Sequence, residues 1–272
     1  MFVADFSTPR SGRAQDLADA AELPADFICV AYNPGKAVRV DSVAAAAHIK
    51  REAGTETIFN LSPRDMNKLA LESKLLGAQL LGLENLLVVQ GDPMTERDSS
   101  TAVKDYSATG LIAAVRTLNT GVDHKGSKLR APTDFCVGAS VDLGKGVERE
   151  ARLTHRKVAA GAHFLMTQPI FDATEVERFH EAYARVPGDP LTLPVVWGLQ
   201  ILAKDGVVFS NVPDGLRTQL DSGRDAVEIA LETCEKLRAA GVVGIYLVSP
   251  IMRGGARDYT AGLRFLEAVG RT

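Results

Sequence analysis

The feature that most constrains this chain is the repeated alternation of short apolar runs with segments of helical periodicity. The runs are apolar at almost every position rather than at alternate positions, which is typical of parallel strands covered on both faces. Eight runs of this kind follow one another at Phe2–Phe6, Phe27–Tyr32, Glu56–Leu61, Asn85–Gln90, Phe135–Ser140, His163–Gln168, Pro194–Gln200 and Gly244–Ser249.

Eight strand–helix units in 272 residues match the number of units and the size of a (β/α)8 TIM barrel. No linker or change in composition divides the chain, so we expect residues 1–272 to form a single catalytic domain of the α/β class. A doubly wound open sheet is the structural alternative. It is less favoured because no G-x-G-x-x-G pattern follows the first run.

Residues typical of helix starts and ends support this organisation. Ser62-Pro63-Arg64-Asp65 offers an N-cap, a proline at the first helical position and an acid in the first turn. We expect that helix to carry Leu69, Leu76 and Leu80 towards the core and to end near Gly82. Further helices are expected at Arg13–Leu23, Val43–Ala53, Glu148–Ala160 and Asp225–Ala240.

Composition excludes several classes of protein. Apolar residues make up 46% and the net charge is −3, which argues against disorder and against a nucleic-acid-binding surface. No apolar run approaches the ~18–20 residues of a membrane helix, and residues 1–10 lack the pattern of a secretory signal. The three cysteines and five histidines show no metal-binding spacing. We therefore expect a soluble, cytoplasmic protein that uses no metal.

Barrel enzymes carry their catalytic groups at the carboxyl ends of the strands. Those positions hold a few carboxylates and many amides, and an amide can pair with the polar edge of a neutral heterocycle. They are Asp5, Tyr32, Asn33, Asn60, Gln90, Asp92, Ser140, Asp142, Gln168, Gln200 and Ser249.

Glycines near strand ends leave two interpretations open. Gly254-Gly255, after the eighth run, would suit a phosphate cup or a simple turn. Gly144-Lys145-Gly146, before a helix, would suit an anion site or a solvated turn. Asp92 follows a glycine and precedes a proline, so it starts its loop in an extended conformation beside flexible backbone.

Several segments together resemble the methylenetetrahydrofolate reductase family. Val89–Pro93 (VQGDP) is similar to that family's L-R-G-D-P, and His155–Ala162 (HRKVAAGA) is similar to K-R-K-V-D-A-G-A. Met166–Asp172 (MTQPIFD) resembles I-T-Q-F-F-F-D, and Asp5–Arg10 (DFSTPR) resembles E-F-F-P-P-R. Asn60–Ser62 stands where the family has H-L-T. The segments occur in the family's order over most of the chain, and the resemblance implies a TIM barrel.

The resemblance implies an oxidoreductase acting on a CH–NH group, which reduces 5,10-methylenetetrahydrofolate to 5-methyltetrahydrofolate with NADH or NADPH. Asp5 would take the place of the glutamate that protonates the folate, and Asp92 would lie beside the pterin and stabilise its cation. The remaining implied residues are Gln168, Phe209, Asn60 and Gln200 for the folate, and Tyr32, Gln90, Arg156 and Lys157 for the cofactor.

The resemblance also implies FAD, but the chain departs from the flavin-binding members. Arg and His of those members are replaced by Gln90 and Asn60, and Tyr and His by Ala139 and Leu143. Arg156 and Lys157 could still hold phosphates, so flavin-bound and flavin-free reductases both stay open. A catalytically silent folate-binding relative and a phosphate-handling lyase or aldolase are the functional alternatives. Assembly into a homo-oligomer also stays open.

Overall fold

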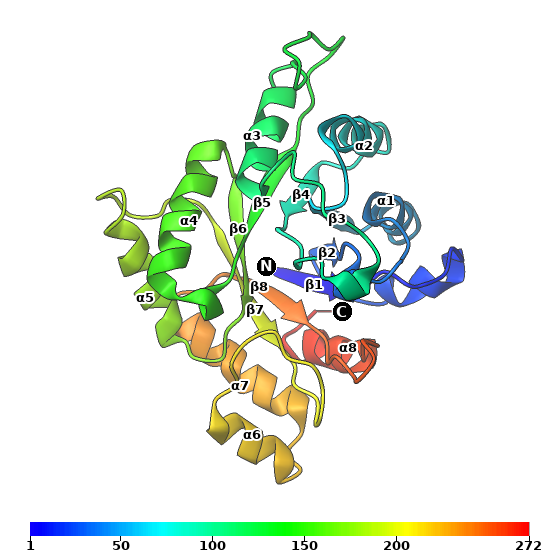
Figure 1. Cartoon of the computed structure of the whole chain (residues 1–272). Coiled ribbons are helices and arrows are strands. Elements are labelled where there is room, and N and C mark those ends of the chain that lie inside the picture. The colour runs from blue at the N-terminus through cyan, green and yellow to red at the C-terminus, as the bar shows by residue number, and fades with distance from the viewer. Residues whose placement is uncertain (272) are drawn as a thin grey trace.

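The computed structural model describes residues 1–271, which form a closed barrel of parallel strands in the order of the sequence (Figure 1). All eight predicted strands are present, so the predicted (β/α)8 TIM barrel is confirmed. The strands are β1 (Phe2–Phe6), β2 (Phe27–Val30), β3 (Glu56–Leu61), β4 (Asn85–Val88), β5 (Cys136–Val141), β6 (Phe164–Pro169), β7 (Val195–Gln200) and β8 (Gly244–Val248).

Helices surround the barrel and cover the outer face of its strands (Figure 1). They are α1 (Ser42–Ala53), α2 (Lys68–Leu80), α3 (Ala108–Leu118), α4 (Val147–Ala160), α5 (Thr174–Ala184), α6 (Asp214–Asp221), α7 (Ala226–Ala239) and α8 (Tyr259–Ala268). Short 3-10 helices are η1 (Ala14–Ala20), η2 (Pro34–Lys36), η3 (Glu96–Asp98) and η4 (Leu143–Lys145). The helix expected at Arg13–Leu23 is therefore one of these 3-10 segments.

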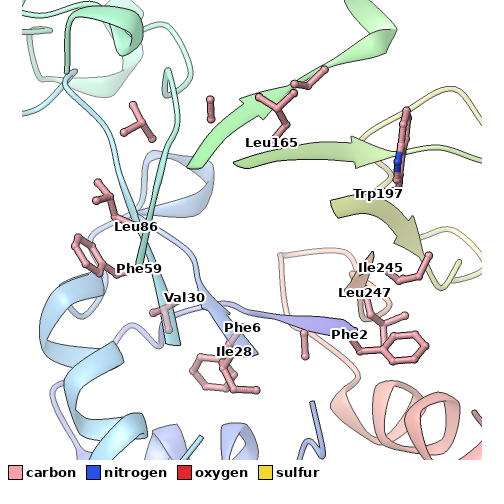
Figure 2. Close-up of a cluster of buried hydrophobic side chains, with 14 of the residues drawn as sticks. Phe2, Phe6, Ile28, Val30, Phe59, Leu86, Leu165, Trp197, Ile245 and Leu247 are labelled. Carbon is pink, nitrogen blue, oxygen red and sulfur yellow. The ribbon is translucent and has the colours of Figure 1, made fainter. Parts of the chain in front are cut away.

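The strands separate two apolar cores. On β1, Phe2, Ala4 and Phe6 belong to the large core between strands and helices, part of which Figure 2 shows. Val3 belongs instead to a smaller cluster, which also contains Cys29, Ile58, Leu87, Met166 and Val196. Because successive side chains of a strand point to opposite faces, this smaller cluster fills the barrel interior. Asp5, two positions after Val3, comes next along the interior face towards the carboxyl end of β1.

The prediction for α2 was wrong in both its start and its buried face. Ser62 does not cap a helix, because its hydroxyl donates to the Gln90 carbonyl at 3.2 Å and accepts from the Arg64 amide. Asn67 is the N-cap, accepting from the Ala70 amide. The buried face holds Leu71, Leu75 and Ala78, whereas Leu69, Leu76 and Leu80 are exposed. Leucines occur on both faces of this helix, so composition alone did not reveal which face packs.

The two long polar loops lie at opposite ends of the barrel. The polar stretch 93–106 follows β4 and contains only η3, so it lies at the carboxyl ends of the strands. The stretch 119–133 connects α3 to β5 and lies at the opposite end. Among residues 1–271 we find no helix long and apolar enough to cross a membrane.

Candidate active site

A buried carboxylate lies at the carboxyl end of β1. Asp5 is 3% exposed, and both of its oxygens accept hydrogen bonds. The Tyr246 hydroxyl donates to Oδ1 at 2.7 Å, and Nε of Arg257 donates to Oδ2 at 3.1 Å. A carboxylate this deeply buried would be strongly destabilising without such partners. The barrel therefore holds an ion pair inside its mouth.

Tyr246 and Cys29, which lie near Asp5, are neutral donors. Burial, and then the charge of Asp5, raise the pKa of Tyr246 well above its ordinary value. The same two causes raise the pKa of the Cys29 thiol, which donates to Oδ1 of Asn60 at 3.3 Å. Cys29 pairs with Asp5 across β1 and β2. Both groups stay protonated at neutral pH, so neither supplies a nucleophile.

Arg257 comes from the loop after β8, where an antiparallel bridge with Ile251 fixes its position. Burial alone would lower the pKa of this guanidinium, but the charge and hydrogen bond of Asp5 raise it above its ordinary value. Its guanidinium carbon lies 5.9 Å from the ring centroid of Phe209. The structure thus brings Phe209, predicted from a distant segment, next to the partner of Asp5.

Gln200 holds the segment that carries Phe209. Its amide nitrogen donates to the Val207 carbonyl at 2.8 Å, and its amide oxygen accepts from the Phe209 backbone N–H at 3.3 Å. The side chain is 2% exposed. Both ends of this predicted substrate-binding amide are therefore occupied by the protein's own backbone.

The loop after β4 is fixed by Arg64, which the sequence suggested only as part of a helix start. The guanidinium binds Asp65 through two hydrogen bonds, at 2.6 and 2.7 Å, and donates to the Asp92 carbonyl at 3.0 Å. Gly91 adopts φ +74°, and a Cβ there would lie 2.6 Å from Oγ of Ser62. This close approach explains why the G-D-P segment requires its glycine. The side chain of Asp92 is exposed.

The other predicted residues are distributed around the mouth. Gln168 on β6 is half-buried, and its amide forms no hydrogen bond with residues 1–271. Gln90 is exposed, and its amide oxygen accepts from the Ala108 amide at the start of α3 at 3.4 Å. Tyr32 is half-buried, and burial together with the nearby Asp65 raises its pKa.

The residues proposed to hold phosphates belong to α4 and to the turn that precedes it, after β5. Lys157 is buried on α4 and donates to the Ser140 carbonyl, and burial lowers its pKa. Arg156 is exposed near the end of the same helix. Lys145, in the glycine-flanked turn, pairs with Asp142 at 2.9 Å.

Two of the four positions at which the resemblance implies contacts to FAD are apolar and buried. Ala139 and Leu143 belong to the large core outside the barrel, where they are 0% and 6% exposed. Asn60 accepts from the Cys29 thiol, and Gln90 is neutral. None of these four positions offers a charged donor to a diphosphate or a flavin ring. Within residues 1–271, no cluster of three or more His, Cys, Asp or Glu could hold a metal ion either.

Fold and site together define a class, namely a TIM barrel with a buried charged centre at the carboxyl ends of its strands. The sequence model for methylenetetrahydrofolate reductase matches residues 1–250. The chain belongs to the methylenetetrahydrofolate reductase family, which confirms the resemblance seen in its motifs.

Relatives of known name agree with this assignment. The chain is 24% identical to methylenetetrahydrofolate reductase 2 of Saccharomyces cerevisiae, over 82% of this chain and 39% of the relative. It is 21% identical to methylenetetrahydrofolate reductase 1 of Schizosaccharomyces pombe, over 73% and 34%. It is 20% identical to the maize (Zea mays) methylenetetrahydrofolate reductase (NADH) 1, over 89% and 43%. The chain therefore spans less than half the length of these relatives.

A solved structure shows the same fold at lower identity. An uncharacterized protein from Clostridium thermocellum that binds two copies of 5-methyl-5,6,7,8-tetrahydrofolic acid superposes with a TM-score of 0.69. The alignment covers 99% of this chain and 94% of that protein, with 11% identical residues. At this identity the similarity concerns the barrel alone.

Proposed function

We propose that this chain reduces 5,10-methylenetetrahydrofolate to 5-methyltetrahydrofolate with NADH or NADPH. The observation that carries the proposal is the buried Asp5 in the mouth of a barrel of this family, next to Arg257 and the partly exposed ring of Phe209. A carboxylate and an aromatic ring suit a flat cationic intermediate. The folate named for the Clostridium thermocellum barrel supports the same class of ligand.

The chemistry requires one proton and one hydride. Protonation of N10 of the folate breaks its bond to the bridging carbon and leaves an iminium cation between that carbon and N5. The nicotinamide then transfers hydride to the carbon, the π electrons return to N5, and the products are the methylated folate and NAD(P)+. A general acid and a nearby negative charge accelerate these steps.

We assign the acid to Asp5. Both of its oxygens accept hydrogen bonds in this structure, so it must take up a proton before it can donate one. In the proposed reaction Asp5 receives this proton from solvent as the folate binds. The Tyr246 hydroxyl keeps the carboxylate in place while this transfer occurs.

We assign the remaining contacts to the opposite side of the mouth. Asp92 would lie beside the pterin and stabilise the cation, on a loop that Arg64 holds through its backbone. Gln168 would pair with the pterin edge, since its amide has no other partner among residues 1–271. Gln200 would act indirectly, by holding the segment of Phe209.

We further propose that hydride passes directly from the nicotinamide to the folate, without FAD. The neutral side chains of Asn60 and Gln90, where the resemblance implies a histidine and an arginine, support this proposal. Hydrogen bonds to charged groups contribute about 1.5–3 kcal/mol each, so loss of several would weaken FAD by several powers of ten. Hydride transfer between two carbon centres needs no one-electron step.

Initial-rate kinetics and a visible absorption spectrum test these proposals together. Oxidation of NADH or NADPH that depends on methylenetetrahydrofolate is expected, with intersecting double-reciprocal plots from a ternary complex. Parallel plots, or stoichiometric FAD in protein purified without added flavin, would contradict direct transfer while leaving the reductase in place.

A catalytically silent folate-binding protein is the second candidate. The engagement of both Asp5 oxygens by Tyr246 and Arg257 favours it, because the resting carboxylate has no proton to give. Binding of 5-methyltetrahydrofolate without any folate-dependent oxidation of NADH or NADPH would establish this role instead.

A further inference from the structure

Two buried polar atoms without partners flank the segment after β1. Among the described residues 1–271, Oγ of Ser7 and Nε of Arg39 are buried and form no hydrogen bond. Arg39 donates through Nη1 to the Thr8 carbonyl at 2.6 Å, and the Val40 amide donates to the Pro9 carbonyl. Buried donors in native proteins are almost always satisfied, so an unsatisfied one indicates a missing partner.

The same place holds an excess of positive charge. Burial lowers the pKa of Arg39, and the neighbouring charges of Arg257 and Arg10 lower it further. Arg257 is neutralised by Asp5, but Arg39 forms no ion pair with any residue in 1–271. Guanidinium groups in proximity repel one another, and a bound anion would relieve that repulsion.

A glycine turn leaves the space beside Arg39 open. Gly254 and Gly255 adopt φ +89° and +88°, in the loop that the Ile251–Arg257 bridge closes. A Cβ built on Gly255 would lie 3.7 Å from Nη2 of Arg39 and would touch nothing else within 4 Å. Any larger residue would be strained and would project towards the guanidinium. The sequence left this pair of glycines open between a phosphate cup and a simple turn.

We propose that Arg39, Arg10 and the Gly254–Gly255 turn form a subsite for an oxyanion, a carboxylate or a phosphate, at the mouth of the barrel. Arg39, which is half-buried, supplies the main contact through the guanidinium that faces the glycine turn, and Arg10 adds charge from the surface. The subsite lies at the carboxyl ends of β1, β2 and β8, beside the Asp5 centre. It binds an anionic part of a substrate remote from the reacting ring.

The identity of the carrier, meaning the molecule to which the bound anionic group belongs, rests on the proposed function. A folate carries carboxylates on its glutamate tail, and a nicotinamide dinucleotide carries phosphates. The chemistry recognised by Arg39 is common to both, because a guanidinium forms paired hydrogen bonds with either group. Binding of each carrier by itself distinguishes them.

The experiment is calorimetric titration of the full chain with 5-methyltetrahydrofolate as mono- and triglutamate, with NADH, with NADPH and with inorganic pyrophosphate. The variants are Arg39→Met, which keeps the apolar stem, and Arg39→Lys, which keeps the charge. Arg130→Gln is the control, because it removes one exposed charge from the loop after α3 at the other end of the barrel. Thermal unfolding of each variant reports folding.

We expect Arg39→Met to weaken one carrier, folate or dinucleotide, by about 10- to 100-fold, as for loss of a charged hydrogen-bond partner. Arg39→Lys should recover part of that loss, and Arg130→Gln should change nothing. Dissociation constants within twofold of wild type for all ligands would overturn the subsite, as would equal losses in Arg39→Met and Arg130→Gln.

Pyrophosphate separates failure of the subsite from failure of the proposed function. If the wild-type chain binds neither folate nor dinucleotide, the proposed function fails. Pyrophosphate binding that is lost in Arg39→Met then supports the subsite, whereas absent or unchanged binding overturns it. If Arg39→Met unfolds, the same comparison is made with Arg39→Lys and Arg10→Gln, and unchanged binding in both overturns the subsite.

Discussion

Two sectors of the barrel mouth hold their polar side chains in different ways. The first sector, formed by the ends of β8, β1 and β2, buries Asp5 in an ion pair with Arg257. The second sector, formed by the ends of β4, β5 and β6, exposes Asp92 and leaves Gln168 without a partner among residues 1–271. The first sector is organised before any ligand arrives, whereas the second depends on the ligand for its hydrogen bonds.

The difference indicates that the two sectors have different roles in the reaction. Preorganised charge in a water-poor site is effective where charge develops in a transition state. Unpartnered amides and exposed carboxylates recognise a ligand and fix its orientation. Variants in the first sector should therefore affect both turnover and folding, and those in the second should mainly affect binding.

The largest effect is expected at Asp5. Asp5→Asn should lower turnover by about 10²–10⁴-fold, as for loss of a general acid. It also leaves Arg257 buried without a countercharge, which should lower the free energy of unfolding by about 3–5 kcal/mol. Initial rates and urea denaturation measure the two consequences separately.

The double variant Asp5→Asn/Arg257→Met makes the separation sharper. Removing the unpaired guanidinium should restore most of the lost stability, because pairing is the origin of that loss. Turnover should stay low, because the acid is still missing. A double variant that regains turnover would show that Asp5 only balances Arg257.

The second-largest effect is expected at Arg64, which holds the loop of the second sector through the Asp92 carbonyl. Arg64→Met removes the contacts to Asp65 and to the Asp92 carbonyl, and should lower the free energy of unfolding by about 3 kcal/mol. The freed loop should raise KM for the folate about tenfold, since Asp92 is then poorly positioned. Arg51→Met is the matched control, because its pair with Glu52 is exposed and such pairs contribute about 0–1 kcal/mol.

Gln168→Leu should have a smaller and more selective effect. An amide that pairs with the pterin contributes equally to the ground and transition states, so KM should rise about tenfold while kcat changes less. Stability should change by less than about 1.5 kcal/mol, because the volume is nearly conserved. An unchanged KM for the folate would mean that Gln168 has only a packing role.

The sequence revealed the second sector better than the first, for a physical reason. The G-D-P and T-Q segments are continuous in the chain, so they are visible as motifs. The partners of Asp5 lie 241 and 252 residues away, and only barrel closure brings β8 beside β1. Nothing in the surroundings of Tyr246 or Arg257 in the sequence marks them as partners of an acid near the N-terminus.

Strand positions were predictable for a similar reason, and helix faces less so. Parallel strands buried on both sides give continuous apolar runs. Such runs are recognised without deciding which residues face the core, and all eight were found. A helix face must be assigned from periodicity. In α2, leucines lie both on the buried face at Leu71 and Leu75 and on the exposed face at Leu69 and Leu80. The alternation of strand side chains did place Asp5 in the barrel interior once the strand was known.

The smallest effect is expected from Tyr246→Phe, and it tests how tightly the first sector is organised. Loss of the hydroxyl removes one of the two donors to Asp5 and should lower the free energy of unfolding at pH 7 by about 1–2 kcal/mol. Tyr183→Phe is the matched control, because that hydroxyl forms no hydrogen bond with residues 1–271.

Alkaline pH supplies a second test of the same contact. The folded-state pKa of Tyr246 lies well above its ordinary value, so above pH ~10 the unfolded chain loses a proton that the folded chain keeps. That difference lowers wild-type stability by about 1.4 kcal/mol per pH unit for this tyrosine, and the loss is absent below pH ~10. Tyr246→Phe should therefore give a flatter decline in urea denaturation between pH 10 and 11. An identical decline in the variant would mean that the Tyr246 hydroxyl is not held by the Asp5 centre.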